Sequence, residues 1–89
     1  MITVRKMEQL MNINADQLTD MMSDAGYPVA DEPFINTHFD GISTTAGNCV
    51  NFVYQGMYLD IHGEGGFQYA RVIVSYNADT GVTSIDYAA

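Results

Sequence analysis

The sequence predicts an α+β fold, with two short N-terminal helices packed on one face of a four- to five-stranded antiparallel β-meander. Two observations lead to this class. Apolar residues recur at helical spacing up to about residue 25, whereas β-branched and aromatic runs separated by glycine-containing turns follow. Every connection after residue 46 is short, which favours antiparallel neighbours. With 89 residues, we expect one domain over 1–89, comprising a helical part (1–27) and a sheet part (33–89).

The first helix is expected over residues 3–11. Val4, Met7 and Met11 recur at helical spacing, and Leu10 lies beside them. We therefore expect these four side chains to form the buried face. A polar break after Met11 separates this helix from the next.

The second helix is expected over residues 15–25. Asn14 is a good N-cap, and Gln17 three residues later completes a capping box. Gly26 and Pro28 end the helix, because glycine adopts the left-handed C-cap conformation and proline cannot continue a helix. The expected buried stripe consists of Ala15, Leu18, Met21, Met22 and Ala25.

The sheet part alternates runs typical of strands with turn signals. Expected strands cover 34–39, 49–54, 57–62, 67–76 and 82–87, with 42–45 as a short pairing segment. The expected turns are Asp40-Gly41, 46–48, 63–66, 77–81 and the two-residue hairpin loop Gln55-Gly56.

The net charge of the chain excludes more classes of function than any sequence motif does. Eleven acids against three bases give a net charge of −8 and a pI near 4.1. Because phosphate binding needs Lys and Arg and anionic lipid repels acidic chains, we expect neither direct nucleic-acid binding nor membrane binding. No base lies between Lys6 and Arg71, a stretch that carries nine acids. Either these carboxylates simply confer solubility, or they form a negative surface for a positive partner.

A row of three aspartates on the second helix is the first candidate site. Asp16, Asp20 and Asp24 are spaced by four residues, which places them on one helix face about 6 Å apart along the axis. Like charges at this spacing destabilise a helix. The row is either a solvated face or a line of carboxylates, spaced somewhat like phosphates, that engages Lys and Arg on a partner. We predict a partner-binding surface formed by Asp16, Asp20, Asp24, Asp31, Glu32, Tyr58, Asp60 and Glu64.

An alternative site uses two similar triplets. His38 with Asp40 and His62 with Glu64 each place an imidazole and a carboxylate at positions i and i+2, which share one face of a strand. The four side chains could hold a divalent metal if the two strand ends meet. Both triplets also run into glycines, where such residues are ordinary components of turns. We predict no bound metal or cofactor.

Cys49 is the one cysteine, so an internal disulfide is excluded. It is expected to be a packed strand residue, because no base can be assigned to activate it as a nucleophile. The missing disulfide and the absence of a signal-peptide pattern favour the cytoplasm.

These features predict a non-enzymatic inhibitor that binds a basic, nucleic-acid-binding protein as a monomer or homodimer. In size and charge the chain resembles small acidic phage proteins that block host defence, such as anti-CRISPR and anti-restriction proteins. That resemblance implies nucleic-acid mimicry in the cytoplasm of a host cell, and it assigns no site residue. The alternatives are an immunity protein or antitoxin against a nuclease toxin, a small metal-binding protein or enzyme, and a self-associating structural component.

Overall fold

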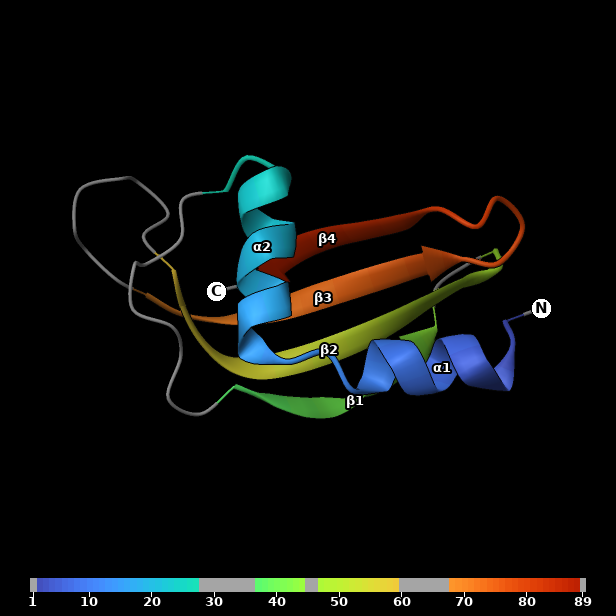
Figure 1. Ribbon diagram of the computed structural model, residues 1–89, viewed down its shortest axis with the longest axis horizontal. Coiled ribbons are helices and arrows are strands. Elements are labelled where there is room, and N and C mark those ends of the chain that lie inside the picture. The colour runs from blue at the N-terminus through green and yellow to red at the C-terminus, as the bar shows by residue number, and fades with distance from the viewer. Residues whose placement is uncertain (1, 28–36, 45–46, 60–67, 89) are drawn as a thin grey trace.

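The computed structural model describes residues 2–27, 37–44, 47–59 and 68–88. Two helices, α1 (Val4–Met11) and α2 (Ala15–Asp24), precede four strands. The strands are β1 (His38–Thr44), β2 (Cys49–Leu59), β3 (Gln68–Asn77) and β4 (Thr83–Ala88). They form one antiparallel sheet in the order β1-β2-β3-β4, and both helices lie on the same face of it (Figure 1). The predicted α+β class and the meander are confirmed.

Helix α1 begins at the N-cap Thr3, whose side chain accepts a hydrogen bond from the Lys6 backbone N–H at 3.1 Å. Leu10 is buried, and Met7 and Met11 pack partly against the core. The prediction for Val4 is wrong, because this side chain is 73% exposed. At 100° per residue, Val4 lies about 120° around the helix from Leu10, so it sits at the margin of the face that meets the sheet.

Helix α2 begins as its sequence predicts. The Asn14 side chain accepts a hydrogen bond from the Gln17 N–H at 2.8 Å, and the Gln17 side chain accepts one from the Asn14 N–H at 3.1 Å. The helix ends with Gly26 in the left-handed region at φ +89°. Ala25 is exposed, contrary to prediction, because it is the C-cap and lies beyond the last residue of the helix.

Two expected turns are instead β-bulges within continuous strands. Phe39 pairs with Tyr54 and Gly41 pairs with Val53, so Asp40 is an extra residue inside β1. Likewise Tyr54 pairs with Val72 and Met57 with Ala70, so two residues of β2, 55 and 56, stand opposite one residue of β3. The turn-forming pairs Asp40-Gly41 and Gln55-Gly56 are therefore used to bend strands rather than to reverse the chain. Strand β2 curls visibly at its C-terminal end in Figure 1.

The β3–β4 hairpin matches the prediction. The Asn77 N–H donates to the Val82 carbonyl at 3.0 Å, and Gly81 adopts φ +74° at the position that requires a left-handed residue. The expected strand residues 34–36 and 60–62 and the expected turn 63–66 lie outside the described residues. The expected segment 42–45 belongs, as far as Thr44, to β1.

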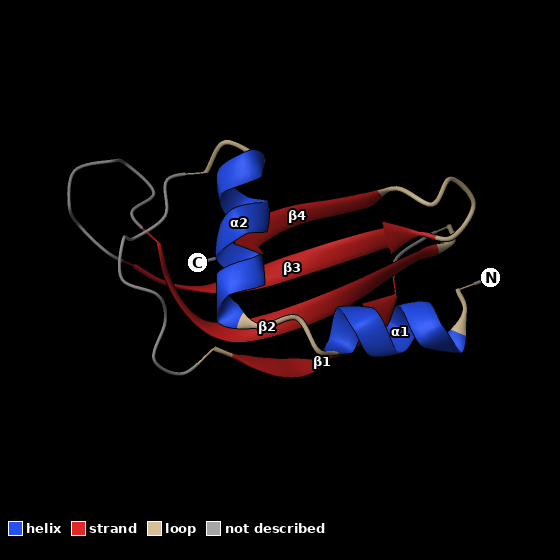
Figure 2. Ribbon diagram, viewed as in Figure 1, coloured by secondary structure: helices blue, strands red, loops and turns tan. Residues whose placement is uncertain are grey.

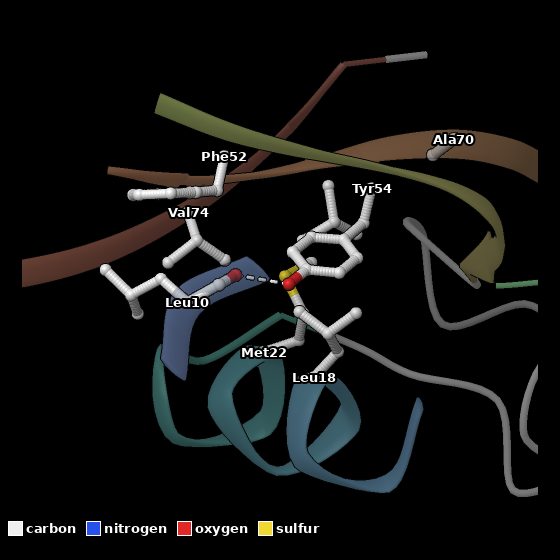
Figure 3. Packing of buried hydrophobic residues seen from close by; sticks show 8 residues of the cluster. Leu10, Leu18, Met22, Phe52, Tyr54, Ala70 and Val74 are labelled. Atoms are coloured by element: carbon white, nitrogen blue, oxygen red, sulfur yellow. Dashed lines mark hydrogen bonds between the residues drawn. The ribbon is translucent and has the colours of Figure 1, made fainter. Parts of the chain in front are cut away.

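The core forms between the two helices and one face of the sheet (Figure 3). Its buried members are Leu10, Leu18, Met22, Phe52, Tyr54, Ala70, Val72 and Val74. Helix α2 runs across the strands and α1 runs along them (Figure 2), so the two helices meet at a corner above the sheet. The Tyr54 hydroxyl lies beneath this corner, where it donates to the Leu10 carbonyl and accepts from the Ile13 N–H.

Candidate functional site

The structure brings Asp16, Asp20 and Asp24 to the solvent side of α2. All three are exposed, whereas Leu18 and Met22 on the opposite side of the helix are fully buried. We call these three residues the α2 carboxylate row. Asp16 lies in the first turn, where the helix dipole favours an anion, but Asp24 lies at the negative end of the dipole. The helix dipole therefore stabilises the negative charge at the start of the row but not at its end.

No base on α2 offsets this charge. The three bases lie elsewhere, Arg5 and Lys6 on α1 and Arg71 on β3. The Lys6 ammonium lies 5.4 Å from the centroid of the Tyr76 ring, a cation–π distance. Within the described residues, the α2 carboxylate row forms no ion pair or hydrogen bond through its side chains. Its charge is thus left uncompensated by this part of the chain.

Most of the other described acids are engaged locally. The Asn48 side-chain amide donates to both oxygens of Asp79, at 2.8 and 2.9 Å. The Gln55 amide donates to Asp40 at 3.3 Å. Asp86 accepts from the Tyr27 hydroxyl at 3.2 Å and from the Tyr87 N–H at 2.8 Å.

These acids lie apart from one another, Glu8 on α1, Asp40 on β1, Asp86 on β4 and Asp79 in the turn between β3 and β4. The α2 carboxylate row is therefore the one aligned group of acids in the described part of the chain.

Two clefts flank the row on the side that faces β4. The first has a volume of about 550 Å³ and lies between α1, α2 and the start of β4. The second, about 500 Å³, lies between the C-terminal half of α2 and residues 83–85. Both clefts are lined by Met21 and Thr83, so they lie next to each other, and we call the two together the α2–β4 groove. Asp20 lines the first cleft and Asp24 the second.

Tyr27 lines the second cleft, and its hydroxyl is held by a hydrogen bond to Asp86. The Tyr27 and Tyr87 rings meet edge to face, with centroids 5.2 Å apart. The hydrogen bond to the Asp86 carboxylate is the main reason that the pKa of Tyr27 is raised above its usual value, since the neighbouring negative charge favours the protonated phenol.

Only part of the predicted surface falls within the described residues. Asp31, Glu32, Asp60 and Glu64 lie outside the described residues. Tyr58 belongs to β2 and pairs with Tyr69, but its side chain is outside the description. The part of the predicted surface that the structure does bring together is the α2 carboxylate row.

The alternative metal site is likewise only half placed. His38 and Asp40 lie on β1, whereas His62 and Glu64 lie outside the described residues. Among the residues that the structure does describe, no group of three or more metal-ligating side chains is close enough to hold an ion. Cys49 is a partly buried free thiol at the start of β2.

The α2–β4 groove is not predicted by any pattern in the sequence. Thr83, Ser84 and Ile85 carry no charge and form no motif, so their side chains gave no signal. The available signal was topological, because the last strand of a meander is an edge strand with unpaired backbone groups.

In comparisons with protein-family models, curated proteins and solved structures, nothing matches this chain. The two described helices, of 8 and 10 residues, are too short to cross a membrane.

Proposed function

We propose that this protein is a non-enzymatic inhibitor that binds a basic, nucleic-acid-binding protein through the α2 carboxylate row. One observation supports this proposal above the others. Three exposed carboxylates line one face of a rigidly capped helix, and no base in the described part of the chain neutralises them. A row that costs helix stability is retained more readily when a cationic partner compensates for it.

The physical mechanism is electrostatic mimicry. Residues four apart on a helix rise about 6 Å, so the row offers a regular line of negative charge to Lys and Arg side chains that otherwise hold phosphates. The net charge of −8 adds long-range attraction, which accelerates encounter with a basic protein. The proposal places the protein with small acidic inhibitors of the anti-CRISPR or anti-restriction type, acting in the cytoplasm of a host cell.

Affinity capture from bacterial lysate tests this proposal. The wild-type chain and an Asp16→Asn/Asp20→Asn/Asp24→Asn variant serve as parallel baits, and mass spectrometry identifies what each retains. We expect the wild type to retain a basic nucleic-acid-binding protein or nuclease complex that the variant releases at lower salt. Capture of a single nuclease toxin would indicate an immunity protein or antitoxin instead. Equal retention by both baits would contradict a role for the row.

A further inference from the structure

Strand β4 is an edge strand whose outward backbone groups can be assigned. In an antiparallel pair, hydrogen-bonded and non-hydrogen-bonded residue pairs alternate. The Asn77 N–H donates to the Val82 carbonyl, so the alternation directs the backbone of Ser84, Asp86 and Ala88 toward β3. The backbone N–H groups of the intervening residues, Thr83, Ile85 and Tyr87, therefore point away from the sheet.

One of these outward groups is already occupied. The Tyr87 N–H donates to the Asp86 carboxylate at 2.8 Å, which agrees with its outward direction. The Tyr27 hydroxyl donates to the same oxygen, so this end of the edge is closed by side chains. In the described part of the chain, the N–H groups of Thr83 and Ile85 form no comparable bond with a side chain. The open part of the edge is thus residues 83–85.

The open part of the edge coincides with the α2–β4 groove. Both clefts are lined by Thr83, and the second is also lined by Ser84 and Ile85. In Figure 1 the C-terminal turn of α2 extends past β4, so a chain lying beside β4 would pass beneath it. Met21 and Ala25 supply apolar surface there, and Asp24 supplies charge.

We propose that residues 83–85 of β4 accept an extended, lysine- or arginine-bearing segment of the cationic partner as an added strand. Backbone hydrogen bonds to Thr83 and Ile85 hold that segment, while Asp20 and Asp24 pair with its basic side chains. This inference rests on the proposed function. It adds that the bound segment of the partner is an extended strand and that it pairs with residues 83–85.

Charge complementarity selects this occupant. No base lines the second cleft, and Lys6 at the first lies over the Tyr76 ring. A second copy of the chain would bring another net charge of −8 against the same edge, so pairing of β4 with β4 is opposed by repulsion. A cationic extended segment is instead attracted to this edge by the net negative charge of the chain.

A peptide probe tests the proposal on the full chain. The probe is a short blocked peptide of alternating lysine and valine, titrated at low salt, with a glutamate–valine peptide as the control. Amide hydrogen exchange followed by NMR should show the Thr83 and Ile85 amides slowed roughly two- to tenfold by the lysine peptide. The Ser84 and Asp86 amides, already paired with β3, should change little. The glutamate peptide should have no effect.

A matched pair of variants separates backbone pairing from surface charge. Thr83→Pro removes an outward N–H at the first residue of an edge strand, where proline is tolerated, whereas Thr83→Val keeps the N–H. We expect Thr83→Pro to weaken lysine-peptide binding about fivefold or more and Thr83→Val to leave it unchanged. Thermal unfolding of each variant verifies that the fold is retained. If Thr83→Pro does not fold, the exchange pattern of the wild type decides.

The possible failures are distinguishable. If the lysine peptide shifts signals of α2 but protects neither Thr83 nor Ile85, the added strand is refuted and the carboxylate row keeps its proposed role. If the two amides become protected on raising the concentration of the free protein, the occupant is a second copy and the proposal is wrong. If the lysine peptide does not bind at low salt, the added-strand proposal is also wrong. The proposed function is tested separately by the three-aspartate variant.

Discussion

Removal of the Tyr54 hydroxyl is the sharpest test of how the helices are held on the sheet. The Tyr54 side chain is 1% exposed, and its hydroxyl links the Leu10 carbonyl and the Ile13 N–H of the α1–α2 connection to β2. Tyr54→Phe keeps the ring and leaves both backbone groups without this partner. At about 1 kcal/mol per hydrogen bond, the variant should lose roughly 2 kcal/mol of unfolding free energy. For a chain of this size that corresponds to a melting temperature lower by roughly 10 °C.

Urea denaturation followed by far-UV circular dichroism measures this loss, with the m-value expected to stay constant. Tyr87→Phe is the matched control, because the Tyr87 hydroxyl has no hydrogen-bond partner among the described residues and its ring is retained. We expect the control to change stability by less than about 0.5 kcal/mol. Equal losses in the two variants would refute the bridging role of Tyr54.

The same hydroxyl predicts a pH dependence. Burial raises the pKa of Tyr54 above its ordinary value of 10.0, although the Ile13 N–H partly offsets the shift. A raised pKa means that the folded state holds the proton more tightly than the unfolded state, so this contribution is complete below about pH 10 and is lost as pH rises through the folded pKa. The stability difference between wild type and Tyr54→Phe should therefore shrink above about pH 10. A difference that grows there would reverse the assigned sign.

The remaining predictions concern the cap, the core and one turn. Asn14→Ala removes the capping box and should cost about 1 kcal/mol in urea denaturation; no change would refute the cap. Leu18→Ala leaves a cavity beneath α2 and should cost about 2–5 kcal/mol; a loss under about 1 kcal/mol would contradict its burial. Gly81→Ala places a side chain at φ +74° and should cost about 1–2 kcal/mol, whereas Gly41→Ala, which meets open space at ordinary φ, should cost much less. Equal melting temperatures for the two glycine variants would contradict the strain at Gly81.

The sequence predicts the elements whose signals are local. The capping box of α2 depends on two residues three apart, so it can be recognised in the sequence without knowledge of the fold. The alignment of the carboxylate row follows from helical spacing alone. For this reason the part of the candidate site that lies on α2 was predictable.

The sequence does not distinguish a bulge from a turn. Asp40-Gly41 and Gln55-Gly56 have the composition of tight turns, yet each lies inside a strand because the neighbouring strand continues to pair on both sides of it. The α2–β4 groove could not be predicted from the sequence either, since it depends on where α2 crosses the sheet and on which strand forms the edge.

The proposed function requires that the α2 carboxylate row, rather than net charge alone, binds the partner. The row variant, Asp16→Asn/Asp20→Asn/Asp24→Asn, should fold normally, because it relieves like-charge repulsion on the helix. A control with the same net charge removes three acids that lie off α2. Its substitutions are Glu8→Gln, Asp40→Asn and Asp79→Asn.

The most direct test measures the Kd of the captured partner for both variants across a range of salt concentrations. At about 0.5 kcal/mol for each of the three exposed pairs, the row variant should bind roughly tenfold more weakly and show a flatter salt dependence, while the control stays close to wild type. Equal weakening in the two variants would show that overall charge, and not the row on α2, drives binding. Unchanged binding in the row variant would remove α2 from the interface.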